Sequence, residues 1–360
     1  MNIGMSARKN KIRTDAGIFP SMVYETLQNM GVDVDLIFSQ LNALQHPIDY
    51  PQRDLRYDNR VQKKFWELTE VITQNSNIGL TVVHHLPTFR GQLFEYIFLS
   101  SANFGDALKI AMKYYQFFTT GLDIELHIED DTVTLKGFHH PVRHYLECTI
   151  TIVLSFFDYI SQGKFQAQEI WLSYDNTEFQ DLYHELWHCP VYFNQPHGCI
   201  KFKAEILEYA SPSAQPDLFL LHQAIIEKHI ELVDKHELVI QIEEALGEQL
   251  KLRQFALEDI ARILKLSPRK IQISLKDIGT NYENVLSSFR QKLARQLLAK
   301  TALKHDEIVY LTGFSEPSAF SRAFKYWTGE SPSSYRHRMQ NSTDHGSIEI
   351  MCKNSKAGSS

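Results

Sequence analysis

The chain has 360 residues, of which 43% are hydrophobic and 22% charged, and its formal net charge at pH 7 is −6. This length predicts two domains or three. No run of eighteen apolar residues occurs, which excludes a transmembrane helix, and four cysteines without a CxxC pair do not suggest a disulfide framework. The start of the chain, Met1 to Asp15, is basic and polar and lacks the apolar segment of a secretory signal. We therefore expect a cytoplasmic protein with no membrane partner.

The net charge is unevenly distributed along the chain. Residues 235–340 carry 17 lysine and arginine side chains against 12 aspartate and glutamate side chains, an excess of 5 positive charges, so the remainder carries −11. A basic C-terminal segment on an acidic body is the electrostatic layout expected where only the C-terminal part of a chain contacts nucleic acid.

The N-terminal part has the patterns of an α+β domain. Apolar residues at helical spacing come first, and the period then changes to alternation at 123–129 and 132–137, which predicts a β-hairpin turning at Asp130-Asp131. Val191–Phe193 and Ile200–Phe202 predict a second hairpin. The other predicted elements are two short helices within 22–41, helices at 59–74, 103–118, 142–161 and 178–187, and a strand near 167–173. We therefore expect an antiparallel sheet covered by helices.

One motif in this part resembles a catalytic one. His184-Glu-Leu-Trp-His188 matches H-E-x-x-H, in which two imidazoles on one helical face hold zinc and the glutamate is the base. Cys189-Pro190 follows at once and ends the helix, and a chain with 16 histidines produces this pattern easily. We expect no catalytic residue, no metal and no cofactor. The remote alternative is a zinc metalloenzyme built on His184, Glu185 and His188.

Residues 255–276 predict a helix-turn-helix. Apolar residues in 255–266 have helical spacing, and Ser267 followed by Pro268 is typical of an N-cap and a first helical position. The helix that starts there, Pro268 to Lys276, would be a first recognition helix for DNA.

A second helix-turn-helix is predicted at 307–336. Its first helix ends at Gly313, which can adopt the left-handed conformation, and Ser315 is expected to cap the next helix, with Pro317 near its start. In that helix Phe320 and Phe324 lie four residues apart and face inward. The outer face is left with Ser318, Arg322 and Lys325.

A long helix predicted at 282–300 joins the two units. At 1.5 Å per residue it would span roughly 27 Å. Two recognition helices about one DNA turn apart, roughly 34 Å, could enter successive major grooves on one face of the duplex. We therefore expect an all-α C-terminal domain with two helix-turn-helix units that binds double-stranded promoter DNA.

The second unit also closely resembles the signature of the AraC/XylS family of bacterial transcription regulators. The matching residues are the turn Gly313-Phe-Ser, then Phe320-Ser-Arg-Ala-Phe-Lys325, then Gly329-Glu-Ser-Pro-Ser-Ser-Tyr-Arg336. The resemblance is dense over about thirty residues. It implies a sequence-specific transcription regulator and not an enzyme, with RNA polymerase as a partner and activation as the expected outcome.

Two stretches of the N-terminal part are similar to the ligand-sensing domain of the ornithine-regulator-like branch of that family. They are Phe98-Leu-Ser-Ser-Ala102 and Pro190-Val-Tyr-Phe-Asn194. This resemblance implies a small-molecule effector bound in the N-terminal domain, and a homodimer is a further expected assembly. The alternative is a regulator whose N-terminal domain only dimerises or contacts a protein.

No residue set identifies the effector. Aromatic side chains on the predicted helix 103–118 are candidates for lining a pocket, because such pockets are apolar with a few polar anchors. The same side chains packing a core is the alternative. The candidates are Tyr114, Tyr115 and Phe118.

The first helix-turn-helix departs from the family pattern. Where relatives have Leu-Gln-Arg-Arg-Leu, this chain has Ile271-Gln-Ile-Ser-Leu275, and Tyr326 in the second unit stands where the family often has arginine. We expect the second unit to carry more of the affinity, because charge that seeks phosphate is lost from the first. The expected DNA-binding residues are Ser267, Arg269, Lys270, Gln272, Lys276, Ser315, Glu316, Ser318, Ala319, Arg322 and Lys325.

These patterns and resemblances divide the chain into five parts. We expect a flexible N-terminus (1–15), an effector-sensing or oligomerisation domain (16–212), a helical connector (213–236), the DNA-binding domain (237–340) and a disordered tail (341–360).

Overall fold

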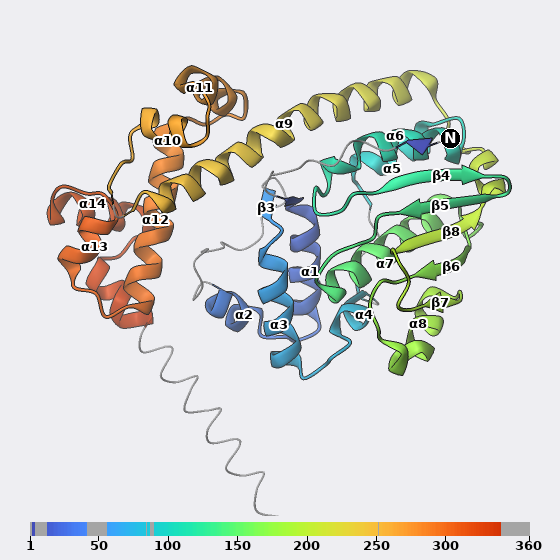
Figure 1. Ribbon diagram of the computed structural model, residues 1–360, viewed down its shortest axis with the longest axis horizontal. Coiled ribbons are helices and arrows are strands. Elements are labelled where there is room, and N and C mark those ends of the chain that lie inside the picture. The colour runs from blue at the N-terminus through green and yellow to red at the C-terminus, as the bar shows by residue number, and fades with distance from the viewer. Residues whose placement is uncertain are drawn as a thin grey trace, which may run out of the picture. The chain divides into compact units, whose positions relative to one another are not determined.

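The computed structural model describes residues 2–3, 13–41, 56–83, 85–86, 90–250 and 252–339. The chain divides into two compact units (Figure 1). Unit 1 comprises Met1–Gln40 and Asp49–Glu237, and unit 2 comprises Leu41–Ile48 and Leu238–Ser360. The tail expected at 341–360 and most of the N-terminus expected at 1–15 lie outside the described residues. No helix in the described part of the chain is both long and apolar enough to cross a membrane.

A six-stranded sheet in the order β1-β4-β5-β8-β6-β7 belongs to unit 1. The predicted first hairpin is confirmed, because β4 and β5 pair antiparallel with Glu129 opposite Thr132. All neighbouring strands of this sheet are antiparallel except β6 and β7, which are parallel. The strands are β1 (Asn2–Ile3), β4 (Glu125–Glu129), β5 (Thr132–Lys136), β6 (Ala167–Trp171), β7 (Val191–Tyr192) and β8 (Cys199–Lys203).

The predicted second hairpin is wrong. β7 and β8 are not neighbours, because β6 lies between them and pairs parallel with β7 and antiparallel with β8. β8 is an inner strand with β5 on its other side, and its Ile200 and Phe202 are fully buried. Alternation of apolar residues identified both segments as strands but does not specify the partner of either. The sheet is therefore mixed.

The predicted helices of the N-terminal part are all present, with ends shifted by a few residues. They were expected at 22–41, 59–74, 103–118, 142–161 and 178–187. α7 packs on the sheet, because its Phe157 lies against Phe202 of β8 with ring centroids 6.1 Å apart. The sequence patterns did not predict α4 or α5. The helices are α1 (Ile18–Asn29), α2 (Val34–Leu41), α3 (Val61–Thr73), α4 (Ile78–Val83), α5 (Leu93–Ser100), α6 (Phe104–Tyr114), α7 (Arg143–Ile160) and α8 (Gln180–Trp187).

The division between the units falls within one long helix, α9 (Pro216–Glu248). Glu237, the last residue of unit 1, is buried, and its carboxylate accepts hydrogen bonds from the hydroxyls of Thr14 at 3.3 Å and Thr120 at 3.0 Å. Leu238, the first residue of unit 2, is buried in a hydrophobic core of that unit. Two adjacent residues of one helix are therefore fixed in different units.

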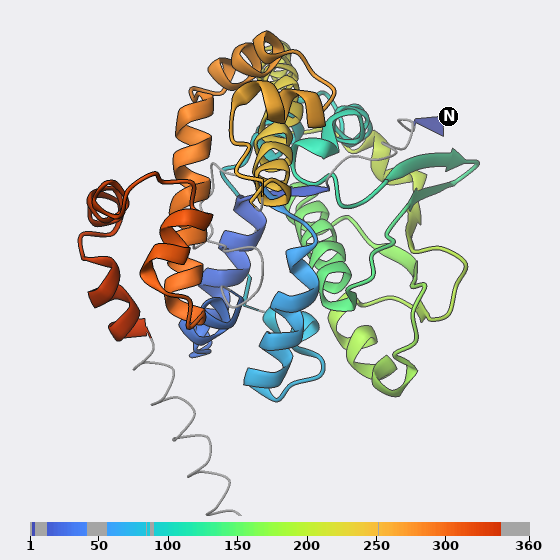
Figure 2. The same cartoon turned by 60° about the vertical axis from the view of Figure 1, so that its left-hand side comes forward.

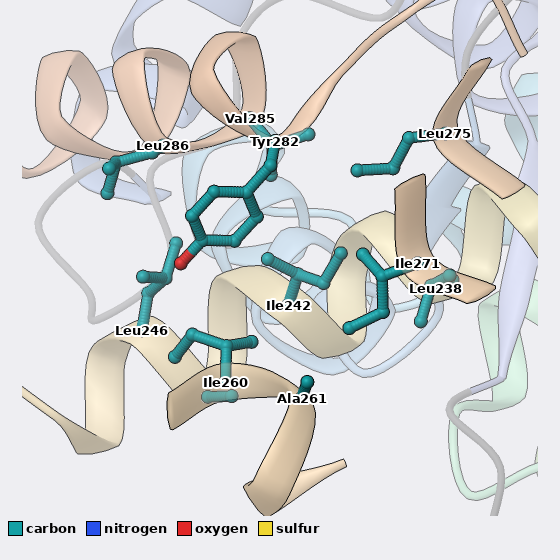
Figure 3. Close-up of a cluster of buried hydrophobic side chains, with 11 residues drawn as sticks. Leu238, Ile242, Leu246, Ile260, Ala261, Ile271, Leu275, Tyr282, Val285 and Leu286 are labelled. Atoms are coloured by element: carbon teal, nitrogen blue, oxygen red, sulfur yellow. The ribbon is translucent and has the colours of Figure 1, made fainter. Parts of the chain in front are cut away.

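Unit 2 has two separate hydrophobic cores joined by α12 (Tyr282–Lys300). Tyr282, Val285 and Leu286 pack in the first core together with the end of α9 (Figure 3), and Ala294 and Leu298 pack in the second. At 1.5 Å per residue the 19 residues of α12 span about 28 Å. The remaining helices are α10 (Leu257–Ile263), α11 (Pro268–Asp277), α13 (His305–Leu311) and α14 (Pro317–Thr328), and residues 332–339 are also helical.

Candidate nucleic-acid interface

The first candidate recognition helix is α11, and its start is fixed by its own side chains. The hydroxyl of Ser267 accepts a hydrogen bond from the backbone N–H of Lys270 at 3.2 Å, and Pro268 occupies the first turn, as the sequence predicts. Ile271 and Leu275, four residues apart, are fully buried in the first core. The helix is therefore seated on one face, and its other face is left to solvent.

The outward face of α11 mixes charged, amide and apolar groups. Arg269, Gln272, Ile273 and Lys276 recur at spacings of three and four, so they share one face. All four are exposed, and Ile273 retains 52% of its accessible surface. Lys270 is also exposed, on the flank of this face. Sequence reasoning placed four of these residues at DNA and omitted Ile273.

The second helix-turn-helix has its turn at Gly313. This residue has a φ of +75°, as predicted for a glycine that ends a helix in the left-handed conformation. The expected capping by Ser315 is wrong. The N-cap of α14 is Glu316, whose backbone is extended and whose side chain makes no capping hydrogen bond, while Pro317 is the first helical residue. Proline restricts the residue before it to extended backbone, which places the cap at Glu316. Ser315 lies one residue outside and is exposed.

The second candidate recognition helix, α14, is seated by aromatic packing. Phe320 and Phe324 are fully buried, and Phe320 meets Phe314 of the turn with ring centroids 5.6 Å apart. Tyr335 packs on Phe324 at 5.3 Å. Arg336, which closes the family signature, donates to the carbonyl of Leu303 at 2.8 Å and so supports the core.

The outward face of α14 carries the expected polar residues and one aromatic side chain. Ser318, Arg322 and Lys325 are exposed, and Ala319 beside them is half-buried. The hydroxyl of Ser318 donates to the Glu316 carboxylate at 3.3 Å. Tyr326 lies on the same face, four residues after Arg322, and is 89% exposed. Helical spacing from Arg322 is the signal that would have placed Tyr326 among the expected DNA-binding residues. Spacing from Arg269 would have placed Ile273 there in the same way.

Two arginines join the turn of the second helix-turn-helix to the start of the first helix-turn-helix. The guanidinium of Arg290, from the middle of α12, lies 5.8 Å from the ring centre of Phe255 and 5.3 Å from that of Phe314. It also donates to the carbonyl of Gly313 at 3.4 Å, and Arg253 donates to the carbonyl of Phe314 at 3.1 Å. Burial lowers the pKa of Arg290 from its ordinary value. Both helix-turn-helix units are thus tied to one side of α12.

The effector candidates on α6 and the residues after it have partners inside unit 1. Tyr114 is buried and its hydroxyl donates to the carboxylate of Glu227. The hydroxyl of Tyr115 accepts from the backbone N–H of Ile124 at 3.2 Å. Phe118 is buried, with its ring 4.5 Å from that of Phe94. Tyr114 and Phe118 are thus buried, Tyr115 is half-buried, and each of the three has a partner within the fold.

The H-E-x-x-H segment does not form the helical arrangement that zinc proteases use. α8 ends at Trp187, and His188 caps it with a φ of +52°, so only the first histidine of the motif lies within the helix. Across the described residues, no group of three or more histidine, cysteine, aspartate or glutamate side chains is placed to hold a metal ion.

Two helices, each seated on its own core and each presenting a polar outward face, define a double helix-turn-helix DNA-binding protein. Residues 31–210 match the family model described as the arabinose-binding domain of AraC transcription regulator, N-terminal, and residues 260–338 match the model of a helix-turn-helix domain. The chain belongs to the AraC family of transcription regulators, and it is not an enzyme.

Three individual proteins are similar to this chain. The chain is 26% identical over 339 residues to the ornithine utilization regulator of Pseudomonas aeruginosa, which covers 91% of this chain and 99% of that protein. It is 38% identical over 80 residues to the HTH-type transcriptional regulator GlxA of Rhizobium meliloti, 22% of this chain and 25% of that one. Among solved structures it matches the transcriptional regulator CdpR from Pseudomonas aeruginosa with a TM-score of 0.37 and 21% identity, over 84% of this chain and 98% of that one.

The turn at Gly313 generates a stability prediction. An added Cβ there would lie 2.5 Å from Cε2 of Phe255 and 3.2 Å from Nη2 of Arg290, whereas at Gly279, with a similar φ of +74°, it would meet nothing within 4 Å. Gly279→Ala should lower the free energy of unfolding by about 1–2 kcal/mol through backbone strain alone. Gly313→Ala should cost a further ~1–3 kcal/mol of overpacking. Urea unfolding followed by circular dichroism measures both, and equal losses would contradict the close packing at Gly313.

Proposed function

We propose that the protein regulates transcription by placing α11 and α14 in successive major grooves of promoter DNA, under the control of a small molecule bound by unit 1. The observation that carries the proposal is the pair of outward faces. Each lies on a helix whose other side is fully buried, and together they present arginine, lysine and glutamine side chains to solvent. Such groups recognise phosphates and base edges.

The side chains on the two faces suit different tasks. Arg322 is suited to a bidentate contact with O6 and N7 of guanine, and Gln272 to one with N6 and N7 of adenine. Arg269, Lys270, Lys276 and Lys325 supply positive charge for the phosphate backbone. We infer that Ser267, Ser315, Glu316, Ser318 and Ala319 complete the contact surface near the starts of the two helices.

The two faces are unequal in charge. The middle of the α11 face is Ile273, an apolar residue, while the middle of the α14 face is Arg322. We therefore propose that α14 contributes more of the binding free energy and that α11 helps to fix the position of the protein along the DNA. Activation through RNA polymerase bound nearby is the regulatory outcome we propose, and the cytoplasm, where the chromosome lies, is the proposed compartment.

The functional division of the chain follows the same proposal. Residues 16–212 would form the sensing domain, 213–236 the connector and 237–340 the DNA-binding domain. Because Glu237 and Leu238 are buried in different units, α9 is the covalent route by which a change in unit 1 would reach unit 2. An effector that favours one state of unit 1 would shift the DNA-binding equilibrium by its difference in affinity for the two states.

A second candidate function is a regulator whose unit 1 serves only for assembly. The partners of Tyr114, Tyr115 and Phe118 favour it, since these aromatic side chains are already engaged within the fold. The two candidates differ in whether unit 1 has a small-molecule ligand.

A thermal-shift screen separates them. Ornithine and arabinose come first, because a relative is named for ornithine utilisation and the family model for arabinose binding. A ligand at 100 times its Kd should stabilise the fold by about 2.7 kcal/mol and raise the melting temperature. If no amino acid, sugar or other metabolite raises it, the assembly-only candidate gains and control by a small molecule loses its support.

Arg322→Ala tests the proposed role of α14. Loss of a bidentate base contact should weaken promoter binding by about 1–3 kcal/mol and reduce the salt dependence only slightly. The matched control is Arg262→Ala on α10, an exposed arginine paired with Asp259 at 3.0 Å and outside both faces. Mobility-shift titration at several salt concentrations gives both quantities. Unchanged affinity of Arg322→Ala would mean that α14 does not read DNA through this residue.

Ile273→Arg tests the proposed weakness of α11. The new guanidinium would stand in the middle of the outward face and release about one more counterion on binding, so affinity should rise by roughly tenfold at low salt. Ile263→Arg is the control, because it adds the same charge at an exposed position of α10. Fluorescence anisotropy with labelled promoter DNA measures the change. An Ile273→Arg variant that binds no better than the Ile263→Arg variant would contradict the assignment.

A further inference from the structure

The direction in which Ile273 projects is set by the side of α11 that is buried. Ile271 and Leu275 are fully buried and point into the first core (Figure 3). Successive residues of an α-helix are turned by about 100° around its axis, so each of these two residues lies about 160° away from Ile273. Ile273 therefore projects on the side of α11 opposite the core, where it is 52% exposed.

The exposed side chains around Ile273 are mostly cationic. Within four residues of it on α11 lie Arg269, Lys270 and Lys276, against the carboxylate of Asp277, and all four side chains are exposed. A lone exposed apolar side chain is common on protein surfaces and by itself indicates no site. Here it stands at the centre of a face whose charge suits phosphates, so phosphate contacts on either side would place Ile273 over the bases.

The chemistry of the major groove decides which base an apolar side chain can recognise. The C5 methyl group of thymine is the apolar group on the base edges there. Over any other base edge, an isoleucine would take amino or carbonyl groups out of water without supplying a hydrogen bond, which is unfavourable. Isoleucine is thus matched to thymine.

We propose that Ile273 packs against a thymine methyl group and makes thymine the preferred base at one position of the site that α11 binds. The inference rests on the proposed function, in which α11 lies in a major groove. It deepens that function, because it assigns a specificity-determining role to a residue that carries no charge and forms no hydrogen bond through its side chain.

Gln272 extends the preference to a neighbouring base pair. Consecutive side chains diverge by about 100°, so Gln272 and Ile273 reach different base pairs. Gln272 is exposed, and a glutamine is suited to the N6 and N7 atoms of adenine. A·T pairs are thus expected under α11, whereas Arg322 on α14 is suited to guanine. The two halves of the binding site would differ in base composition.

A protein partner fits this face of α11 less well. The centre of a protein–protein interface is depleted of lysine, whereas Ile273 has Lys270 and Lys276 within one helical turn. One isoleucine also buries far less than the roughly 800 Å² per partner of a standard interface.

Removal of one methyl group from the DNA tests the inference. The full chain first selects its preferred sequence from a random duplex library. Each thymine of that sequence is then replaced in turn by deoxyuridine, which lacks only the C5 methyl group. At one thymine the replacement should weaken binding about fourfold, as expected for one buried methyl group. Because no charge is involved, fluorescence anisotropy should give the same ratio at about 50 and 200 mM salt.

Ile273→Ala identifies the side chain that is responsible. Its shorter side chain withdraws from the methyl group, so this variant should bind the thymine and deoxyuridine duplexes equally. An effect of deoxyuridine on the shape of the DNA would instead persist in the variant. Ile263→Ala is the matched control, because Ile263 is an exposed isoleucine of α10 outside both faces, and it should keep the fourfold ratio. Circular dichroism confirms that both variants are folded.

Ile273→Arg separates affinity from specificity. Its affinity should rise because charge is added, while its ratio between the thymine and deoxyuridine duplexes should fall to about one. A preferred sequence in which no thymine is sensitive to the replacement would overturn the inference and leave the proposed function intact. A fourfold ratio that survives in Ile273→Ala would do the same. If the library yields no preferred sequence, the proposed function itself fails, and the inference fails with it.

Discussion

One half-buried cation, Arg290, links the two helix-turn-helix motifs. Arg290 projects from the middle of α12 and is enclosed by Phe255 of the first helix-turn-helix and Phe314 of the second. α12 itself supplies side chains to both cores (Figure 2 gives a second view of these helices). The distance between the two recognition helices is thus fixed by a rigid helix, and their relative rotation by a cation–π stack that is partly removed from water.

The sequence made some helix starts and turns predictable. Ser267 and Pro268 determine where α11 begins, and Gly313 determines the turn, because each acts through backbone chemistry within a few residues. The separation of β7 from β8 was not predictable, because β6, the strand that lies between them, ends twenty residues before β7 begins. The Arg290 stack was likewise hidden, because it joins residues that are 35 and 24 positions away from it in the chain.

The candidate site shows the same limit. Helical spacing and charge gave most of the exposed residues on α11 and α14, yet Ile273 and Tyr326 were left out of the expected contact residues because neither carries the charge expected at its position. For unit 1, sequence patterns located the helices but not a binding site, because the aromatic side chains that suggested one are bonded to distant residues such as Glu227. A pocket is a property of tertiary contacts.

The separation of unit 2 into two cores has an evolutionary consequence. Residues of the outward faces contribute nothing to either core, and the cores share only α12. Substitutions on one reading helix can therefore accumulate without unfolding the other half. A regulator built in this way can drift toward new operators one half-site at a time.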